Sequence, residues 1–305
     1  MKPHFLCLLL ALLCLVVAAP QRVSAQITPQ EILARGPVEA DYRVAYGADS
    51  EQFGDLRLPE GEGPHPVAVV VHGGCLRSFA TLRTLDRFSE ALTEAGLATW
   101  SLEYRRVDSP GGGWPNTLLD VADGLDHVRE LAGPHGLDLD RVILIGHSSG
   151  GGLATWAAAR HRIPASSPLY RNDPLSVGGA LIIANGAALE PFRPLDEQAC
   201  GADVVDLLVG GTPEEVPDNY ASASPERMLP LGVRQRLLIG ADDAAFTQEI
   251  AVEYARQARE AGDDVQVMLI PDADHFELVA PWAEAWPVVP EVALSLVRGA
   301  ERQSP

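Results

Sequence analysis

The sequence predicts an α/β protein with a mostly parallel, twisted sheet of about eight strands and helices on both of its faces. Short runs rich in β-branched residues alternate along the chain with longer stretches whose apolar residues recur every three or four positions. No internal repeat or low-complexity linker divides the 305 residues, of which 47% are hydrophobic. This composition favours a single domain with a sizeable core.

The first segment is expected to be separate from that domain. Lys2 stands ahead of an apolar run over residues 5–19, and a polar stretch then ends in Val-Ser-Ala directly before Gln26. This layout is typical of a secretory signal peptide, so residues 1–25 are expected to be removed and 26–305 to form the domain. The apolar run is shorter than the ~20 residues that span a bilayer, which argues against stable membrane insertion. We expect a secreted or periplasmic protein.

The charge of the mature chain limits its partners. Without Lys2 and Arg22, 21 of the 23 basic residues remain against 42 acidic ones, a net charge of −21, and no lysine is left. Nucleic acids and anionic membranes are bound through basic patches, so neither is an expected partner. A small-molecule substrate is expected instead, and nothing in the sequence indicates an oligomeric state.

Two cysteines remain in the mature chain, Cys75 and Cys200. In an oxidising compartment they can form one disulfide, and two separate buried thiols are the alternative. The sequence alone does not decide between these. Two lone cysteines offer no zinc-like ligand spacing, so we expect neither a metal nor an organic cofactor.

The strands are expected at residues 38–46, 52–58, 67–71, 98–104, 141–145, 180–183, 236–239 and 265–270. The first two should form an antiparallel hairpin at the sheet edge. Apolar residues at helical spacing predict buried helix faces at Leu118, Val121, Ala122, Leu125 and Val128, and at Ile250, Tyr254 and Ala258. After the sixth strand, the segment 185–234 is rich in proline, glycine and acidic residues. So long a connection is expected to be a small cap over a site.

The pentapeptide Gly-His-Ser-Ser-Gly, residues 146–150, connects a predicted strand to a helical stretch, 153–160. So sharp a strand-to-helix turn needs glycine on both sides of a serine held in a strained conformation at the strand tip. Ser148 is therefore the candidate nucleophile. In the alternative interpretation the segment is a plain glycine-rich turn, with Ser148 or Ser149 capping the helix.

A serine nucleophile needs a base and an orienting carboxylate, and both follow at the ends of later strands. His275 comes after the last predicted strand, and the pair Asp242-Asp243 follows the strand that ends at Gly240. The order Ser, Asp, His fits the hydrolase arrangement, in which the acid usually sits three residues after the glycine. This favours Asp243 over Asp242, with His275 as the base.

The loop His-Gly-Gly-Cys, residues 72–75, follows the third predicted strand. Glycines there let backbone N–H groups face a reacting carbonyl oxygen. The candidate donors of the oxyanion hole are the N–H groups of Gly74 and Ser149, with Cys75 as a further possibility.

These motifs resemble those of the α/β-hydrolase superfamily, and within it the esterase, lipase and kynurenine-formamidase-like serine hydrolases that carry His-Gly-Gly before their first core helix. The resemblance runs from about residue 38 to residue 298, and the Gly-His-Ser-x-Gly-Gly form is also similar to prolyl-oligopeptidase-like peptidases. The pieces that match lie at residues 72–75, 103–106, 111–115, 146–151, 240–243 and 274–276.

The expected function is that of a secreted carboxylesterase that forms an acyl-enzyme on Ser148. An amidase, arylformamidase or peptidase with the same triad is the first alternative, and the sequence lacks the propeller that prolyl-oligopeptidase-like peptidases carry. A non-catalytic binding module on this fold would be expected to have lost one of the three residues.

Overall fold

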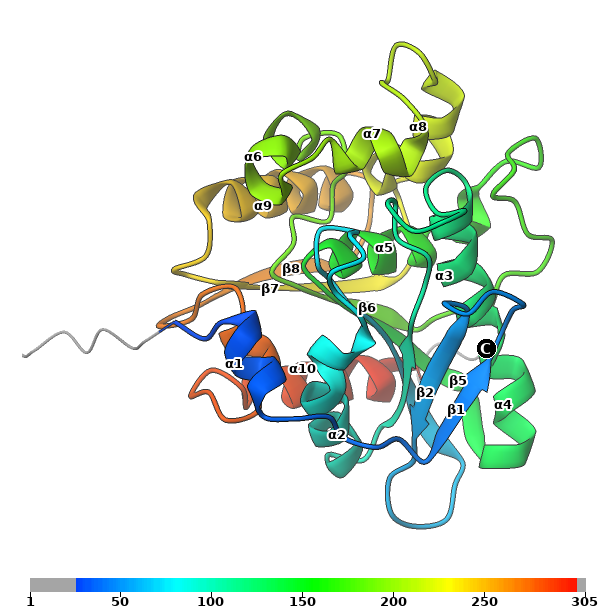
Figure 1. Ribbon diagram of the computed structural model, residues 1–305, viewed down its shortest axis with the longest axis vertical. Coiled ribbons are helices and arrows are strands. Elements are labelled where there is room, and N and C mark those ends of the chain that lie inside the picture. The colour runs from blue at the N-terminus through cyan, green and yellow to red at the C-terminus, as the bar shows by residue number, and fades with distance from the viewer. Residues whose placement is uncertain (1–25, 301–305) are drawn as a thin grey trace, which may run out of the picture.

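The computed structural model describes residues 26–300, so the predicted signal peptide lies outside the described residues. The described chain is built around one eight-stranded sheet (Figure 1). The strands are β1 (Tyr42–Ala45), β2 (Phe53–Arg57), β3 (His65–Val71), β4 (Ala98–Leu102), β5 (Leu137–His147), β6 (Gly179–Ile183), β7 (Arg234–Gly240) and β8 (Val265–Ile270). Each lies where the sequence predicts a strand, and the predicted α/β fold class is confirmed.

The strands are arranged in the order β1-β2-β4-β3-β5-β6-β7-β8. β1 and β2 form the predicted antiparallel hairpin, and β2 is also antiparallel to β4, whereas the other neighbours are parallel. Because the parallel strands end at the same edge, the loops after β3, β5, β6, β7 and β8 are brought together there. Open α/β sheets place their binding sites at this edge.

Helices cover both faces of the sheet because successive side chains of each central strand point to opposite sides. In β3, Val67 and Val69 pack into one core cluster, whereas Ala68 and Val70 pack into the other. The first face is covered by α3 (Asn116–Asp126), α4 (Val128–His135), α5 (Ser149–Ala158) and α9 (Ala245–Glu260). The second is covered by α1 (Pro29–Ala34), α2 (Asp86–Glu94) and α10 (Val288–Ala300) (Figure 1).

The helix faces predicted from apolar spacing are buried, although the helix boundaries differ from the prediction. Val128 belongs to α4 and not to α3, and α5 begins at Ser149 and not at residue 153. The glycines at 150–152 hide the helical period in the sequence, but they lie inside α5. None of the described helices has the length and apolar character needed to cross a bilayer.

Between β6 and β7 the chain forms a layer of short helices (Figure 1). These are α6 (Asp196–Cys200), α7 (Val204–Val209) and α8 (Pro217–Ala223), with 3-10 turns at Arg193–Leu195 and Pro225–Arg227. Val204, Val205 and Leu208 anchor this layer in the core on the α5 side of the sheet. The layer falls within residues 185–234, the segment that the sequence marked as a cap, and is called the cap below.

Candidate active site

Ser148 occupies the turn between β5 and α5 in a backbone conformation that few non-glycine residues adopt. Its φ is +53°, and its N–H donates to the carbonyl of Ile183 at 2.8 Å. Such strain costs about 1–3 kcal/mol and persists only where the surroundings impose it. Although Ser148 is the N-cap residue of α5, its side chain makes no capping hydrogen bond. The hydroxyl instead reaches the cavity at this sheet edge, which disfavours the plain helix-cap alternative.

Close packing explains the glycines on both sides of Ser148. A Cβ on Gly146 would lie 2.2 Å from the carbonyl oxygen of Gly150, and a Cβ on Gly150 would lie 2.3 Å from that of Val71. A Cβ on Gly73 would lie 2.7 Å from the Cβ of Ser148. The loop after β3 can therefore lie against the serine only because these positions carry no side chain.

A chain of hydrogen bonds runs from Ser148 through His275 to Asp243. Ser148 Oγ is 3.0 Å from His275 Nε2, and His275 Nδ1 is 3.1 Å from Asp243 Oδ2. A carboxylate can only accept, so Nδ1 carries the hydrogen and Nε2 is free to accept the serine proton. Asp243 is 8% exposed and also accepts the Ala244 N–H at 2.7 Å, whereas Asp242 is exposed to solvent. Of the two acids that the sequence offered, Asp243 is the one placed against His275.

His147 supports the loop that carries His275. Its Nε2 donates to the carbonyl oxygen of His275 at 2.9 Å, and its ring packs against Phe276. Burial, followed by repulsion from a protonated His275, lowers the pKa of His147 to about 3. The ring therefore remains neutral at ordinary pH and serves as a fixed donor.

The three backbone N–H groups predicted to bind a carbonyl oxygen have no competing intramolecular bond. Gly74 and Cys75 have φ angles of +105° and +55°, and neither N–H has a partner among the described residues. Ser149 is the first residue of α5, where an N–H has no carbonyl one turn earlier. Ser149 Oγ accepts the Leu76 N–H at 3.2 Å, which fixes the loop after β3 to the start of α5. Unpaired N–H groups at a helix start favour a negatively charged ligand.

A buried polar network lies beneath this loop. His72 is 1% exposed, with Nε2 3.0 Å from Glu103 and Nδ1 2.8 Å from the carbonyl of Gly73. Glu103 also accepts the Leu82 N–H at 3.2 Å and pairs with Arg106. Burial alone raises the pKa of Glu103, but His72 and Arg106 outweigh it, so this pKa lies below its usual value. The ionised carboxylate thus holds His72, and through it Gly73, in place.

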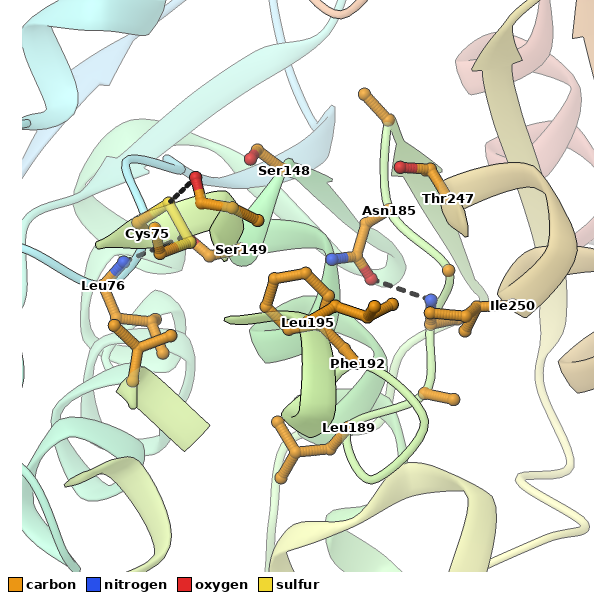
Figure 2. Close-up of a pocket in the computed structure, with 18 of the residues that line it drawn as sticks. Cys75, Leu76, Ser148, Ser149, Asn185, Leu189, Phe192, Leu195, Thr247 and Ile250 are labelled. Carbon is orange, nitrogen blue, oxygen red and sulfur yellow. Dashed lines mark hydrogen bonds between the residues drawn. A yellow bond between two sulfur atoms is a disulfide. The ribbon is translucent and has the colours of Figure 1, made fainter. Parts of the chain in front are cut away.

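The structure joins Cys75 to Cys200 in a disulfide, which selects one of the two alternatives left by the sequence. Cys75 carries one of the candidate donor N–H groups, and Cys200 is the last residue of α6. The bridge closes a separation of 125 residues and is visible beside Ser149 in Figure 2. It ties the loop after β3 to the cap.

A cavity of about 470 Å³ opens beside Ser148 and His275. Most of its lining is apolar and comes from α5, the cap and the first turns of α9. The larger apolar side chains are Leu76, Leu118, Leu153, Trp156, Leu189, Phe192, Leu195, Leu208, Phe246 and Ile250. Apart from Ser148, His275 and Asp243, the polar lining side chains are Ser149, Asn185, Gln198 and Thr247. Within the described part of the chain, no three or more His, Cys, Asp or Glu side chains are grouped to hold a metal ion.

The N-terminal segment reaches the loop that carries His275. Glu277 is 6% exposed, and its two oxygens accept the N–H groups of Ile27 at 2.8 Å and Asp274 at 2.9 Å. A single buried carboxylate thus connects the beginning of the described chain to the residue before His275.

The sequence did not single out Asn185, Thr247 or Glu277. Asn185 follows directly after the predicted sixth strand and its neighbour Ala184, at the sheet edge where sites form, and this position was the available signal. No signal pointed to Thr247 and Glu277, because their roles depend on how α9 and the N-terminal segment pack.

Comparison with known proteins identifies a family and distant relatives. Residues 55–230, more than half of the chain, match the model of the BD-FAE family. An uncharacterised 31.7 kDa protein of Escherichia coli is 33% identical over 108 residues, which are 34% of this chain and 36% of that protein. A probable isoprenylcysteine alpha-carbonyl methylesterase of Oryza sativa subsp. japonica is 29% identical over 116 residues, 37% of this chain and 27% of that protein. The match therefore spans about a third of the length of these relatives.

Solved esterase structures share the fold. Esterase B of Lactobacillus rhamnosis, solved with a tributyrin phosphonate inhibitor, has a TM-score of 0.71 at 19% identity over 90% of each chain. A truncated carbohydrate esterase from gut microbiota has a TM-score of 0.70 at 18% identity, over 86% of this chain and 99% of that chain. These similarities concern the fold, that of the α/β-hydrolase superfamily. Together with the match over residues 55–230, they show that the chain is an α/β-hydrolase and belongs to the BD-FAE family.

Proposed function

We propose that this protein is a serine hydrolase of the carboxylesterase type, which cleaves carboxylic esters through an acyl-enzyme on Ser148. The observation that carries the proposal is the hydrogen-bonded chain from Ser148 through His275 to Asp243, beside an apolar cavity. A serine hydroxyl is a weak nucleophile unless a neighbouring base takes its proton. Here the base His275 contacts Ser148, and the acid Asp243 contacts His275 and orients it. The esterase names of the rice relative and of the solved neighbours support the same chemistry.

In the first step, Ser148 Oγ attacks the ester carbonyl carbon while His275 Nε2 takes its proton. Asp243 accepts the Nδ1 hydrogen of His275 and stabilises the imidazolium that forms. His147 bonds the carbonyl of His275 and stays neutral, so it holds the loop without adding a positive charge beside the imidazolium.

The carbonyl oxygen gains negative charge as the new bond forms. The N–H groups of Gly74, Cys75 and Ser149 are the proposed donors to it. Loss of one such donor typically lowers kcat by ~10²- to 10³-fold, because donors already in position need no reorganisation. The disulfide at Cys75 and the His72–Glu103 pair keep two of these donors in position.

In the second half of the reaction, His275 gives its proton to the departing alcohol and then activates a water molecule. The side chain of His275 is 29% exposed and lines the open cavity, so the alcohol can leave and water can enter beside it. Attack of the water on the acyl carbon releases the acid and restores Ser148.

The proposal is tested by measuring kcat/KM on nitrophenyl esters with acyl chains of two to twelve carbons, an arylformamide and an aminoacyl anilide. Ser148→Ala should lower kcat by ~10⁴-fold or more on every substrate that the protein turns over. A fluorophosphonate probe should label Ser148, and Ser149→Ala, which keeps the nucleophile, should still be labelled.

The outcome of the substrate panel separates the candidate functions. A clear peak among the esters supports the carboxylesterase. Higher kcat/KM on the formamide or the anilide would replace it with an amidase or a peptidase. No Ser148-dependent turnover of any substrate would favour a binding module on the same fold.

We also infer that the protein is exported. The layout of residues 1–25 is that of a signal peptide, and the Cys75–Cys200 bridge suits an oxidising compartment, because disulfides rarely persist in a reducing cytosol. Intact mass analysis of the exported protein should give a chain that begins at Gln26 and holds no free thiol. An N-terminus that still carried residues 1–25 would contradict the inference.

A further inference from the structure

Besides Ser149, whose hydroxyl accepts the Leu76 N–H, the cavity beside Ser148 is lined by three polar side chains that the proposed mechanism does not use. Gln198 is exposed to solvent, whereas Asn185 is half-buried and Thr247 is buried. Within the described part of the chain, neither Nδ2 of Asn185 nor Oγ1 of Thr247 has a hydrogen-bond partner. Asn185 is half-buried, and both residues line the cavity, so each atom keeps a free hydrogen-bonding position for a molecule bound there. Two unpaired groups in a cavity whose walls are mostly apolar therefore favour a polar atom in the bound substrate.

The orientation of the Asn185 amide is fixed by its neighbour Ala187. Oδ1 accepts the Ala187 N–H at 2.7 Å, and a backbone N–H can only donate, so the oxygen must take that position. In Figure 2 the amide nitrogen lies on the opposite side, towards Ser148 and Ser149. Asn185 therefore presents its N–H donors to the cavity.

The backbone around Asn185 is arranged to hold this amide in place. Ala184 and Ala187 have φ angles of +52° and +61°, which non-glycine residues seldom adopt and which cluster at functional sites. A Cβ on Gly151 would lie 2.8 Å from the Cβ of Asn185. The absence of a side chain at Gly151, in the first turn of α5, thus leaves room for Asn185 beside the nucleophile.

Thr247 contributes a hydroxyl from the first turn of α9. A helical threonine commonly bonds the carbonyl one turn earlier, as Thr155 does with Gly151 at 2.8 Å. Thr247 makes no such bond, although it is only 5% exposed. Its oxygen points into the cavity in Figure 2, where it can donate or accept.

The cavity fits the acyl side of the ester. His275 Nε2 must reach the alcohol in order to protonate it, and the partial exposure of His275 lets the alcohol leave on the solvent side. The acyl group stays bonded to Ser148 and occupies the cavity. The carbonyl that accepts the Ser148 N–H belongs to Ile183, two residues before Asn185, and Ser148 and Asn185 both line this cavity.

We propose that Asn185 and Thr247 form an oxygen-binding subsite for the acyl group, and that the preferred substrates are esters of acids with a hydroxyl or oxo oxygen a few bonds from the carboxyl carbon. This inference rests on the proposed esterase function. Asn185 Nδ2 donates to that oxygen, and Thr247 Oγ1 donates to an oxo oxygen or accepts from a hydroxyl. The apolar walls contact the carbon skeleton on either side.

The test uses pairs of nitrophenyl esters that differ only by a hydroxyl in place of a methyl group. 3-Hydroxybutyrate is compared with 3-methylbutyrate, and 2-hydroxypropanoate with 2-methylpropanoate. Each kcat/KM is divided by the hydroxide-catalysed rate constant, because oxygen substituents activate the carbonyl. The corrected ratio within at least one pair should favour the hydroxy acid by about ten-fold or more, the effect of hydrogen bonds that the methyl analogue leaves unmade.

Three variants assign the selectivity. Asn185→Asp keeps the acceptor for the Ala187 N–H but removes the donors, so it should bring the corrected ratio to about one. Thr247→Val preserves shape, removes the hydroxyl and should lower the ratio several-fold. Asn172→Asp makes the same charge change at an exposed residue outside the cavity and should keep the wild-type ratio. Thermal unfolding of each variant checks its fold. If Asn185→Asp does not fold, the corrected ratio of Thr247→Val alone tests the subsite.

Corrected ratios near one for both pairs, with hydrolysis that still depends on Ser148, would overturn the subsite and leave the esterase standing. Ratios that persist in both Asn185→Asp and Thr247→Val would overturn it as well. Selectivity seen only when the hydroxyl is placed on the alcohol would overturn the acyl assignment. If no ester is hydrolysed with Ser148 in place, both the subsite and the proposed function fail.

Discussion

Asp242 and Asp243 are chemically identical neighbours, yet only Asp243 is buried against His275. Asp243→Asn should lower kcat by ~10⁴-fold, because an amide no longer holds the His275 tautomer that leaves Nε2 free. Asp242→Asn removes an equal charge from a solvent-exposed position and should stay within a few-fold of wild type. Both are measured on the best nitrophenyl ester, and equal losses in the two variants would show that the acid is misassigned.

His147 gives the protein a predictable sensitivity to acid. Its pKa is about 3 in the folded state against 6.5 for the free side chain, because it is buried beside His275. As pH falls below 6.5, the unfolded chain binds a proton that the folded state does not. The free energy of unfolding should then decrease by up to about 1.4 kcal/mol per pH unit from this group. This contribution is fully present above pH 6.5 and is lost progressively towards pH 3.

Urea unfolding between pH 7 and pH 5 tests this linkage. His147→Gln can keep a hydrogen-bond donor but cannot titrate, so its stability should fall less steeply with acid than that of wild type. His135→Gln, at a histidine that is only partly buried, is the matched control and should retain the wild-type slope. Parallel slopes for wild type and His147→Gln would contradict the assignment.

At the scale of elements, the disulfide between the loop after β3 and α6 should contribute strongly to stability. It closes a separation of 125 residues, and a cross-link over so long a loop removes much of the entropy of the unfolded chain. The double variant Cys75→Ser, Cys200→Ser should lose ~2–5 kcal/mol of unfolding free energy in urea titrations. Wild type in excess dithiothreitol serves as the control and should lose a similar amount. Unchanged midpoints in both samples would show that the bridge is absent or without effect.

The sheet could be predicted from the sequence because each central strand is buried on both faces and is therefore a run of β-branched residues, as in Val67–Val71. The cap could be predicted only as a segment. Its helices, such as α6 with five residues, are too short to show a helical period. These helices are held in place by the packing of residues such as Leu208 in the core and by the disulfide at Cys200. No local sequence pattern indicates either contact.

The residues of the candidate site likewise fall into two groups, those that the sequence predicted and those that it did not. Ser148, Asp243 and His275 each follow a recognisable strand, so the convergence of strand ends at one edge predicted their meeting. Asn185 and Thr247 become noticeable only when the cavity is seen to be apolar and their polar atoms are seen to be unpaired. Such a property depends on neighbours from several elements, which a single sequence does not reveal.

At the scale of the whole molecule, the net charge of −21 expected for the mature chain should make stability depend on salt. Acidic residues outnumber arginines two to one, so repulsion remains after every arginine is paired. Raising NaCl from about 20 mM to about 500 mM screens this repulsion and should raise Tm by a few degrees. Differential scanning fluorimetry measures the shift. A Tm that falls with salt would mean that attractive surface ion pairs such as Arg256–Glu253 outweigh the repulsion.

The bond between Ile27 and Glu277 has a practical consequence for how this enzyme is produced. An expressed chain that begins at Thr28 lacks the Ile27 N–H, so a buried carboxylate two residues from His275 loses one of its donors. A buried polar group that loses its hydrogen-bond partner lowers the free energy of unfolding by about 1–3 kcal/mol. The shortened protein should therefore melt earlier and turn over esters more slowly than one that begins at Gln26. Preparations that differ only in where leader or tag removal leaves the first residue are expected to differ in specific activity.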